Sequence, residues 1–211
     1  IAIDNRTLYD SLKTRAEELN CVYEISQKIG FQNDPDELLD TIVQAIESVL
    51  EVERVSVMLR EPGSDNLKIV KLRGFSLEDH DFRIDPREGV AGIVFKTGDP
   101  LLVRDVVRDL KVLPERAERY KTGSFLCVPI RLGGQVAGLL NAADKKNGEA
   151  FDLFELQVLS TVSSQLADGL ARIDAKRRDE ELRQYKKDLE TAAQIQINSL
   201  PEIPARMGPL Q

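Results

Sequence analysis

The side chains that can do chemistry by themselves are few and far apart in this chain. Its 211 residues contain one histidine, His80, and two cysteines, Cys21 and Cys127. A structural zinc site needs four such ligands at close spacing, so these three residues do not predict one. The sequence also lacks a Ser/His/Asp set, a paired-carboxylate site and a phosphate-cradling loop. We therefore expect neither catalytic residues nor a metal site, and we interpret this chain as non-enzymatic.

Each of these three side chains has a plain interpretation and a reactive alternative. Cys127 lies in the apolar run "FLCVPI", where burial would keep its thiol protonated and inert; a redox sensor or chromophore anchor is the alternative. Cys21 is expected to be a reduced cysteine on a helix face, with oxidative cross-linking of a dimer as the alternative. His80, within the acidic "LEDHDF", is expected to be solvated. Two isolated cysteines fit a reducing cytoplasm, which is the predicted location.

Composition excludes some partners. The net charge is −7 and the pI is about 5.0, whereas a nucleic-acid partner needs a basic face. No apolar run approaches the roughly 18 residues of a membrane span, so no membrane contact is predicted. Hydrophobic residues make up 42% of the chain, which is enough for a core. The chain begins "IAIDNR", and we expect it to be a piece of a longer protein.

Apolar residues at alternating four- and three-residue steps predict a helix over residues 3–30. The seam of this helix is Leu8, Leu12, Leu19 and Val22. A second helix is predicted from "QNDPDELL" to about residue 50. Asp34 is its expected N-cap, and Pro35 occupies its first helical position.

The period changes to that of β-strands over residues 52–146. "RVSVMLRE" and "LKIVKLRGF" alternate apolar and polar residues around the turn signal "PGSDN", which predicts a β-hairpin. "SFLCVPIRLGGQVAGLLNAADK" predicts a second hairpin with Gly133 and Gly134 in its turn. Between them, "REGVAGIVFKTGDPLLVRDV" predicts a short helix, a turn and a short strand. The pattern indicates an α+β domain with one antiparallel sheet and helices on one face.

From Asp152 onward the pattern is helical for about 48 residues. Its apolar seam has two parts that do not share a heptad phase, with a shift between Ile173 and Leu182. The seam residues are Leu166, Leu170, Ile173, Leu182, Tyr185 and Leu189. Because so long and polar a helix is not stable alone, we expect a parallel homodimer in which the terminal helices form a coiled coil.

Three segments of the chain together resemble a GAF domain. They are "GVAGIVFKTGDPLLVRDV", "FLCVPIRLGGQVAGLLNAADK" and "FDLFELQVLSTVSSQLADGL", and the resemblance covers about residues 30–173. It implies a six-stranded antiparallel sheet with flanking helices, in a regulatory module. Many such domains bind a small molecule between the sheet and the loops of the opposite face. Many also dimerise through their terminal helices and pass signals along them.

Residues around the predicted strands and short helix are candidates for lining a ligand pocket. They are Phe75, Val90, Gly92, Val106, Phe125, Cys127, Pro129 and Leu140. Alternation along strand 125–131 would place Phe125, Cys127 and Pro129 on one face. The alternative interpretation is that all of these residues are simply core. No particular cofactor is predicted, only an unidentified small molecule; haem bound by His80, as in some gas-sensing relatives, is a further alternative.

Some relatives that bind cyclic nucleotides carry an Asn-Lys, a Phe and an Asp-Glu signature. The matching residues here are Asp144-Lys145, Phe151 and Glu155-Leu156. Asp replaces the Asn and one Glu replaces the acidic pair, so a cyclic nucleotide is a minor alternative. We expect Lys145 and Glu155 to form a structural ion pair between the last strand and the long helix, worth under ~1 kcal/mol if exposed.

The end of the chain, "LETAAQIQINSLPEIPARMG", resembles the start of SpoIIE-like phosphatases of the PPM class. The matching residues are Ala192, Ala193, Ile195, Gln196, Leu200, Pro201 and Pro204. The resemblance implies that a metal-dependent serine/threonine phosphatase domain begins here. Because prolines end any helix, a plain helix stop is the alternative.

These interpretations divide the chain into four parts. They are an N-terminal signalling helix (1–30), a GAF domain (31–173), a coiled-coil linker (174–200) and the start of a phosphatase domain (201–211). The predicted function is a sensor and dimerisation module that controls the phosphatase in bacterial signal transduction. The alternatives are a ligand-free dimerisation and spacing module and a cyclic-nucleotide sensor.

Overall fold

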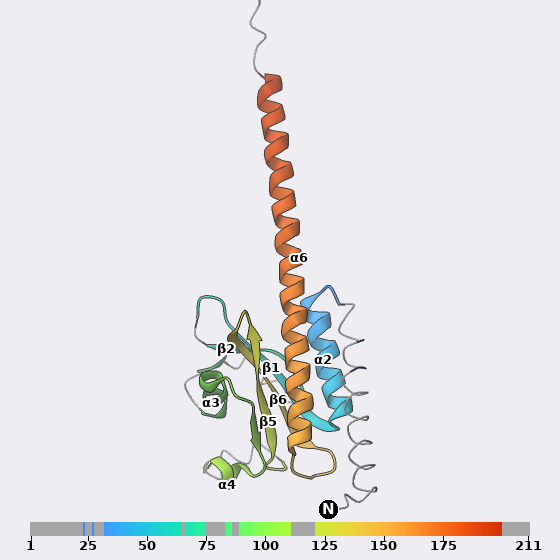
Figure 1. The fold of residues 1–211 in the computed structure, drawn as a ribbon, viewed down its shortest axis with the longest axis vertical. Coiled ribbons are helices and arrows are strands. Elements are labelled where there is room, and N and C mark those ends of the chain that lie inside the picture. The colour runs from blue at the N-terminus through green and yellow to red at the C-terminus, as the bar shows by residue number, and fades with distance from the viewer. Residues whose placement is uncertain are drawn as a thin grey trace, which may run out of the picture. The chain divides into compact units, whose positions relative to one another are not determined.

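The computed structural model describes Tyr23, Gln27 and residues 32–64, 66–74, 83–85, 89–110 and 121–199 (Figure 1). The chain divides into two units, residues 1–171 and residues 172–211, and each is described by itself. Several predictions fall outside the described residues. They concern Leu8, Leu12, Leu19, Cys21, Val22, Phe75, His80 and residues 200–211.

The first unit is built on an antiparallel sheet with the strand order β3-β2-β1-β6-β5-β4. The strands are β1 (Val52–Arg60), β2 (Leu67–Arg73), β3 (Arg83–Ile84), β4 (Leu101–Val103), β5 (Phe125–Leu132) and β6 (Gln135–Lys145). Five of these strands have three or more residues, while β3 is a two-residue edge strand. The α+β class and the antiparallel sheet are confirmed.

Both predicted hairpins are present, because β1 pairs with β2 and β5 pairs with β6. In the second hairpin, Gly133 and Gly134 have φ angles of 59° and 83°. Two consecutive positive φ angles define the type I′ turn, whose twist matches that of the flanking strands. The β5–β6 pairing therefore follows from the "GG" dipeptide between two apolar runs.

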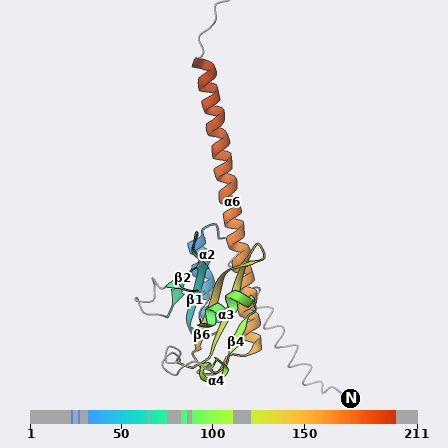
Figure 2. The same ribbon diagram turned by 90° about the vertical axis from the view of Figure 1, so that its left-hand side faces the viewer.

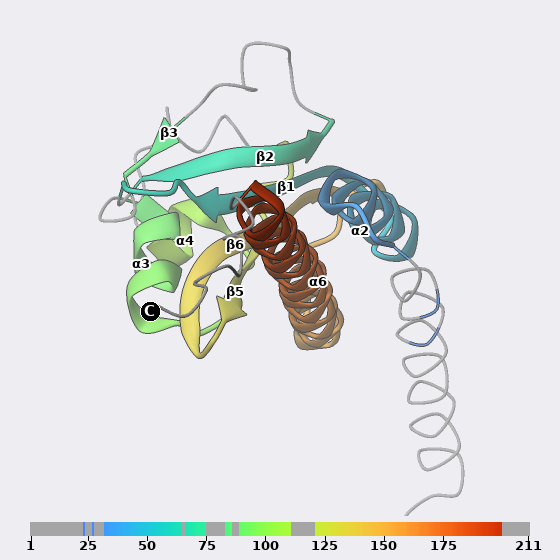
Figure 3. The same cartoon turned by 90° about the horizontal axis from the view of Figure 1, so that it is seen from above.

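Helices cover both faces of the sheet (Figure 3). Helix α2 (Pro35–Val49) packs on β1 and β2, and the first part of α6 (Leu153–Ser199) lies on the same face. Helix α3 (Gly89–Thr97) packs on β5 and β6 from the opposite side, where α4 (Val106–Leu110) also contributes to the core. The expectation of helices on one face is therefore wrong. Residues 125–128 of β5 are all buried, so this strand needs cover on both faces.

Helix α2 begins as its sequence predicts. The Asp34 carboxylate accepts hydrogen bonds from the backbone N–H groups of Asp36 at 2.9 Å and Glu37 at 3.2 Å, and Pro35 opens the helix. The helix presents to the sheet the buried residues Leu38, Leu39, Ile42, Val43, Ala45 and Ile46. These features confirm the predicted second helix and its predicted cap.

The first part of α6 packs on its own domain. The Ser163 hydroxyl donates to the Pro129 carbonyl at 2.8 Å. Leu166, predicted in the dimer seam, is fully buried in this unit, so that assignment is wrong. The apolar stripe of this first part of α6 follows the 3.6-residue period, which suits packing on a sheet as well as packing on a second helix. Leu170 and Ile173 are partly buried.

In the second unit, α6 is a single helix with a polar surface. Leu182, Tyr185 and Leu189 are among its exposed hydrophobic residues. Among the helices of the described ranges, none combines the length and apolarity needed to cross a bilayer.

Candidate functional site

The face of the sheet under α3 carries a compact apolar cluster, here called the α3-side core. Its buried members are Leu67, Val94, Val103, Val106, Phe125, Cys127, Leu139 and Ala143, and its partly buried margin is Met58, Val90, Ala91, Phe95, Leu101 and Val136. Figure 2, viewed from this side, shows α3 in front of the sheet. Of the predicted lining residues, Val106, Phe125 and Cys127 are members of this core, and Val90 lies at its margin.

The other predicted lining residues are more scattered. Gly92 is buried within α3. Pro129 pairs with Leu139, which places it on the face of the α3-side core. Leu140, which is also a predicted lining residue, is not a member of this core. Strand alternation turns Leu140 to the α2 face, one position away from Leu139.

A hydrogen-bonded polar pair lies within this apolar face. Ser56 of β1 and Asn141 of β6 are directly opposite each other, and Cys127 of β5 is opposite Asn141 on the other side. The Asn141 amide donates to the Ser56 hydroxyl at 3.2 Å, and Ser56 is 4% exposed. An apolar wall with a few placed polar groups is the usual composition of a small-molecule site. Sequence reasoning missed this pair, although both residues interrupt apolar strands.

The C-terminal end of α3 is held by two arginines. The Arg131 guanidinium of β5 donates to the Gly98 carbonyl at 2.8 Å. The Arg60 guanidinium of β1 lies 5.0 Å from the centroid of the Phe95 ring. Both contacts anchor the C-terminal end of α3 to the sheet.

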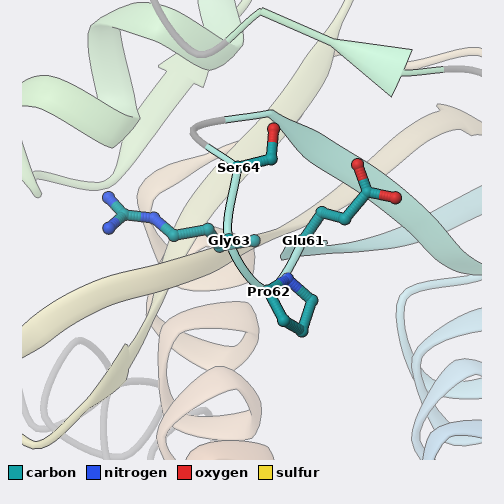
Figure 4. A pocket seen from close by; sticks show the side chains of 5 residues that line it. Glu61, Pro62, Gly63 and Ser64 are labelled. Atoms are coloured by element: carbon teal, nitrogen blue, oxygen red, sulfur yellow. The ribbon is translucent and has the colours of Figure 1, made fainter.

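A surface hollow also lies at the β1–β2 turn. It is lined by Arg60, Glu61, Pro62, Gly63 and Ser64, which are consecutive in the sequence. Figure 4 shows the side chains of Glu61, Pro62 and Ser64 pointing in three different directions. Because these side chains do not converge, the hollow lacks the arrangement expected of a binding site.

Cys127 is a buried free cysteine. Desolvation of the thiolate by burial raises the pKa of its thiol to about 12. The thiol is therefore protonated across the physiological pH range, and thiolate would form only as the pH approaches 12.

We expect Cys127 to resist iodoacetamide at pH 8 in the folded chain and to react once the chain is unfolded in guanidinium. Mass spectrometry of tryptic peptides measures this directly, with Cys21→Ser removing the other thiol. Alkylation of native Cys127 at the rate of the unfolded chain would show that the strand is accessible, and would contradict its place in the α3-side core.

The expected ion pair between Lys145 and Glu155 is present at the β6–α6 junction. The Lys145 ammonium lies 2.8 Å from the Glu155 carboxylate, and the two side chains are 12% and 11% exposed. Glu155 also accepts from the Asp152 N–H at 2.9 Å, while Asp152 accepts from the Glu155 N–H at 2.9 Å. This reciprocal arrangement is a capping box. The pair is thus much less exposed than the surface pair to which a value under ~1 kcal/mol applies.

The neighbouring Asp144 is structural as well. Its backbone φ is 58° and the residue is 1% exposed. Its carboxylate lies 2.5 Å from Arg54 Nε and accepts from the Thr122 N–H at 3.2 Å. The Lys145 ammonium lies 5.9 Å from the Phe151 ring centroid. Of the residues that match the cyclic-nucleotide signature, Lys145 and Glu155 therefore join β6 to α6, while Asp144 binds Arg54 of β1 and the backbone of Thr122.

The described residues hold no group of three or more His, Cys, Asp or Glu side chains that could bind a metal ion.

A model of the GAF domain family matches residues 34–170, which is more than half of the chain. The Nif-specific regulatory protein of Herbaspirillum seropedicae is 30% identical over 128 residues, or 58% of this chain and 23% of that protein. The dual 3',5'-cyclic-AMP and -GMP phosphodiesterase 11 of Drosophila melanogaster is 28% identical over 171 residues, or 73% of this chain and 12% of that protein. The chain thus spans less than a quarter of the length of these curated relatives.

Solved structures share this fold. The GAF domain from a phosphoenolpyruvate-protein phosphotransferase of Coxiella burnetii aligns with a TM-score of 0.66 at 21% identity, covering 77% of this chain and 98% of that one.

Proposed function

Because the chain belongs to the GAF domain family, we propose that it is a regulatory sensor module in a signalling protein. In this proposal a small molecule binds at the α3-side core, and the resulting change in packing passes along α6 to a PPM-class phosphatase domain in the same chain. The observation that carries the proposal is the continuity of α6 over Leu153–Ser199. Its first part packs on the sheet face opposite the α3-side core, where the Ser163 hydroxyl donates to the Pro129 carbonyl, and its last part carries exposed apolar residues.

The chemistry of the α3-side core suggests the kind of ligand. Its wall is apolar, with the Ser56–Asn141 pair as its polar feature. A compact, mostly apolar molecule with one or two hydrogen-bonding groups suits such a wall. Anchoring of α3 by Arg131 and Arg60 at one end favours a response in which the other end moves.

The proposed output is a change in the linker helix of a parallel homodimer. The two parts of the α6 seam are out of phase between Ile173 and Leu182, close to the boundary of the two units at residues 171 and 172. Two coiled-coil registers that differ by a few kcal/mol would give a bistable element here. The relative placement of two phosphatase domains would then follow the register. The phosphatase domain in this proposal is supported by the resemblance of residues 192–204 to the start of SpoIIE-like phosphatases.

A ligand-free dimerisation and spacing module is the second candidate. It is favoured by the burial of the α3-side core, whose eight central members are at most 6% exposed. A cyclic nucleotide is named for the phosphodiesterase relative. In this chain a cyclic nucleotide is disfavoured, because Lys145 and Glu155 are used in the β6–α6 junction.

Native mass spectrometry of the freshly purified chain tests the sensor proposal. We expect a dimer of twice 23.6 kDa with an added mass of a few hundred daltons. Asn141→Ala should lose the added mass, because its amide is the proposed polar contact, whereas Asn147→Ala in an exposed turn should keep it. A dimer without added mass would favour the spacing module, and a monomer would contradict the proposed transmission.

A further inference from the structure

The turn between β6 and α6 contains the one Asn-Gly dipeptide of the chain, Asn147-Gly148. Both residues are exposed, and they follow closely on Lys145 at the end of β6. An Asn-Gly pair can lose ammonia without an enzyme, because glycine has no Cβ to hinder its backbone nitrogen as it attacks the asparagine amide. The Asn147 side chain takes no part in the β6–α6 ion pair or in the α3-side core.

The turn holds the backbone nitrogen that would attack. The Gly148 N–H donates to the Lys145 carbonyl at 2.9 Å, and the φ angle of Gly148 is 74°. This nitrogen becomes a nucleophile only when it loses its proton. A proton that is hydrogen-bonded to a carbonyl is protected from hydroxide, as it is in slow hydrogen exchange. The reaction therefore needs the turn to open first.

Glu149 holds the amide that would be attacked. Its backbone N–H donates to Asn147 Oδ1 at 3.0 Å, and its carboxylate accepts from Asn147 Nδ2 at 3.0 Å. Together the two contacts keep the amide plane in one orientation. Closing a ring with the Gly148 nitrogen would move the amide out of both contacts, so they add to the protection of Asn147.

We propose that Asn147 is a site of spontaneous deamidation that the folded β6–α6 turn keeps closed. When the turn opens, the Gly148 nitrogen gives its proton to hydroxide and attacks Asn147 Cγ. The Cγ–Nδ2 bond breaks, and ammonia leaves with a proton from water, which regenerates the hydroxide. The resulting succinimide adds water and becomes aspartate or isoaspartate. The net reaction consumes one water and releases one ammonia, so it needs no other reactant.

The product weakens the turn in which it forms. A carboxylate at position 147 cannot donate to the Glu149 carboxylate, and the two like charges repel each other. Isoaspartate also lengthens the backbone by one methylene, which disturbs the bond from Gly148 to Lys145. The turn lies between Lys145 and Glu155, whose ion pair joins β6 to α6. The modification therefore acts at the base of α6.

Peptide mapping by mass spectrometry measures the reaction in the full chain, kept in mildly alkaline buffer with and without guanidinium. We expect deamidation of Asn147 to be at least about tenfold slower in the folded chain than in the unfolded chain. Isoaspartate among the products would show that the reaction passes through the succinimide. Equal rates in the folded and unfolded chains would overturn the proposal, because the turn would then give no protection.

Two glutamate variants test the part that Glu149 plays. Glu149→Ala removes the carboxylate contact and keeps the backbone N–H, and it should speed deamidation of the folded chain about fivefold. Glu180→Ala removes an exposed carboxylate of α6 and should leave the rate unchanged. In guanidinium both variants should react as fast as the unaltered chain, because the turn is absent. An unchanged rate in folded Glu149→Ala would overturn the protection by Glu149.

Discussion

Gly138→Ala is expected to lower the free energy of unfolding by about 3 kcal/mol. Gly138 lies in β6, opposite Leu59 of β1 and Ile130 of β5. An added Cβ would meet the backbone carbonyl oxygen of Met58 and the side chain of Leu59. A carbonyl in a strand that is bonded on both sides cannot move aside as a side chain can. The substitution therefore pushes β1 and β6 apart.

Urea unfolding followed by circular dichroism measures this loss. Gly148→Ala is the matched control, because a Cβ there would meet nothing within 4 Å, although its φ of 74° favours glycine. We expect about 1 kcal/mol for that change. Equal losses at the two glycines would contradict the close contact between β1 and β6.

Glu155→Ala is also expected to cost about 3 kcal/mol. The substitution removes the acceptor of the Asp152 N–H at the start of α6 and leaves the Lys145 ammonium, 12% exposed, without its carboxylate. Glu155→Gln keeps an acceptor for Asp152 and should cost about half as much. The difference between the two variants separates the capping contribution from that of the charge.

A double-mutant cycle with Lys145→Met measures the coupling of the pair. We expect the double variant to be more stable than the sum of the single losses by about 1–2 kcal/mol, because no unpaired charge remains. Asp179→Ala, which removes an exposed pair with Arg183, is the control and should cost under ~0.5 kcal/mol. A loss at Glu155 as small as that at Asp179 would mean that the junction is solvated.

The elements that sequence could predict are those set by local chemistry. Asp34 and Pro35 mark the start of α2, and Gly133 and Gly134 mark the β5–β6 turn, because caps and type I′ turns depend on a few adjacent residues. The sequence analysis did not predict that helices would also cover the second face of the sheet. The continuous apolar run from Phe125 to Val128 was the available signal, since alternation would have left one face polar.

The candidate site was less predictable, because it depends on pairing between distant strands. Placing Leu140 on the correct face required the register of β6, where one residue changes the face. The Ser56–Asn141 pair joins residues 85 positions apart, and no local pattern links them. The partner that buries Leu166 could not be predicted either, because an apolar stripe on a helix does not show whether a sheet or another helix covers it.

In the proposed mechanism, α6 transmits a change in the sensor to a phosphatase through its register. The measurement is the phosphatase activity of this chain together with the domain proposed to follow it, with residues inserted after Arg177. Leu170 and Ile173 are three positions apart, as a and d are, so Ile173 is at d, whereas Leu182, three positions before Tyr185, is at a. Ile173 and Leu182 are nine positions apart, so two added residues give eleven, which is the step of four from d to a plus one heptad, and join the two seams in one phase. Seven added residues give sixteen and keep the present offset.

We expect the two-residue insertion to fix the activity in one state, changed about fivefold or more and no longer dependent on the small molecule. The seven-residue insertion should keep both the activity and its regulation. Unchanged, regulated activity in the two-residue variant would contradict transmission through the register of α6.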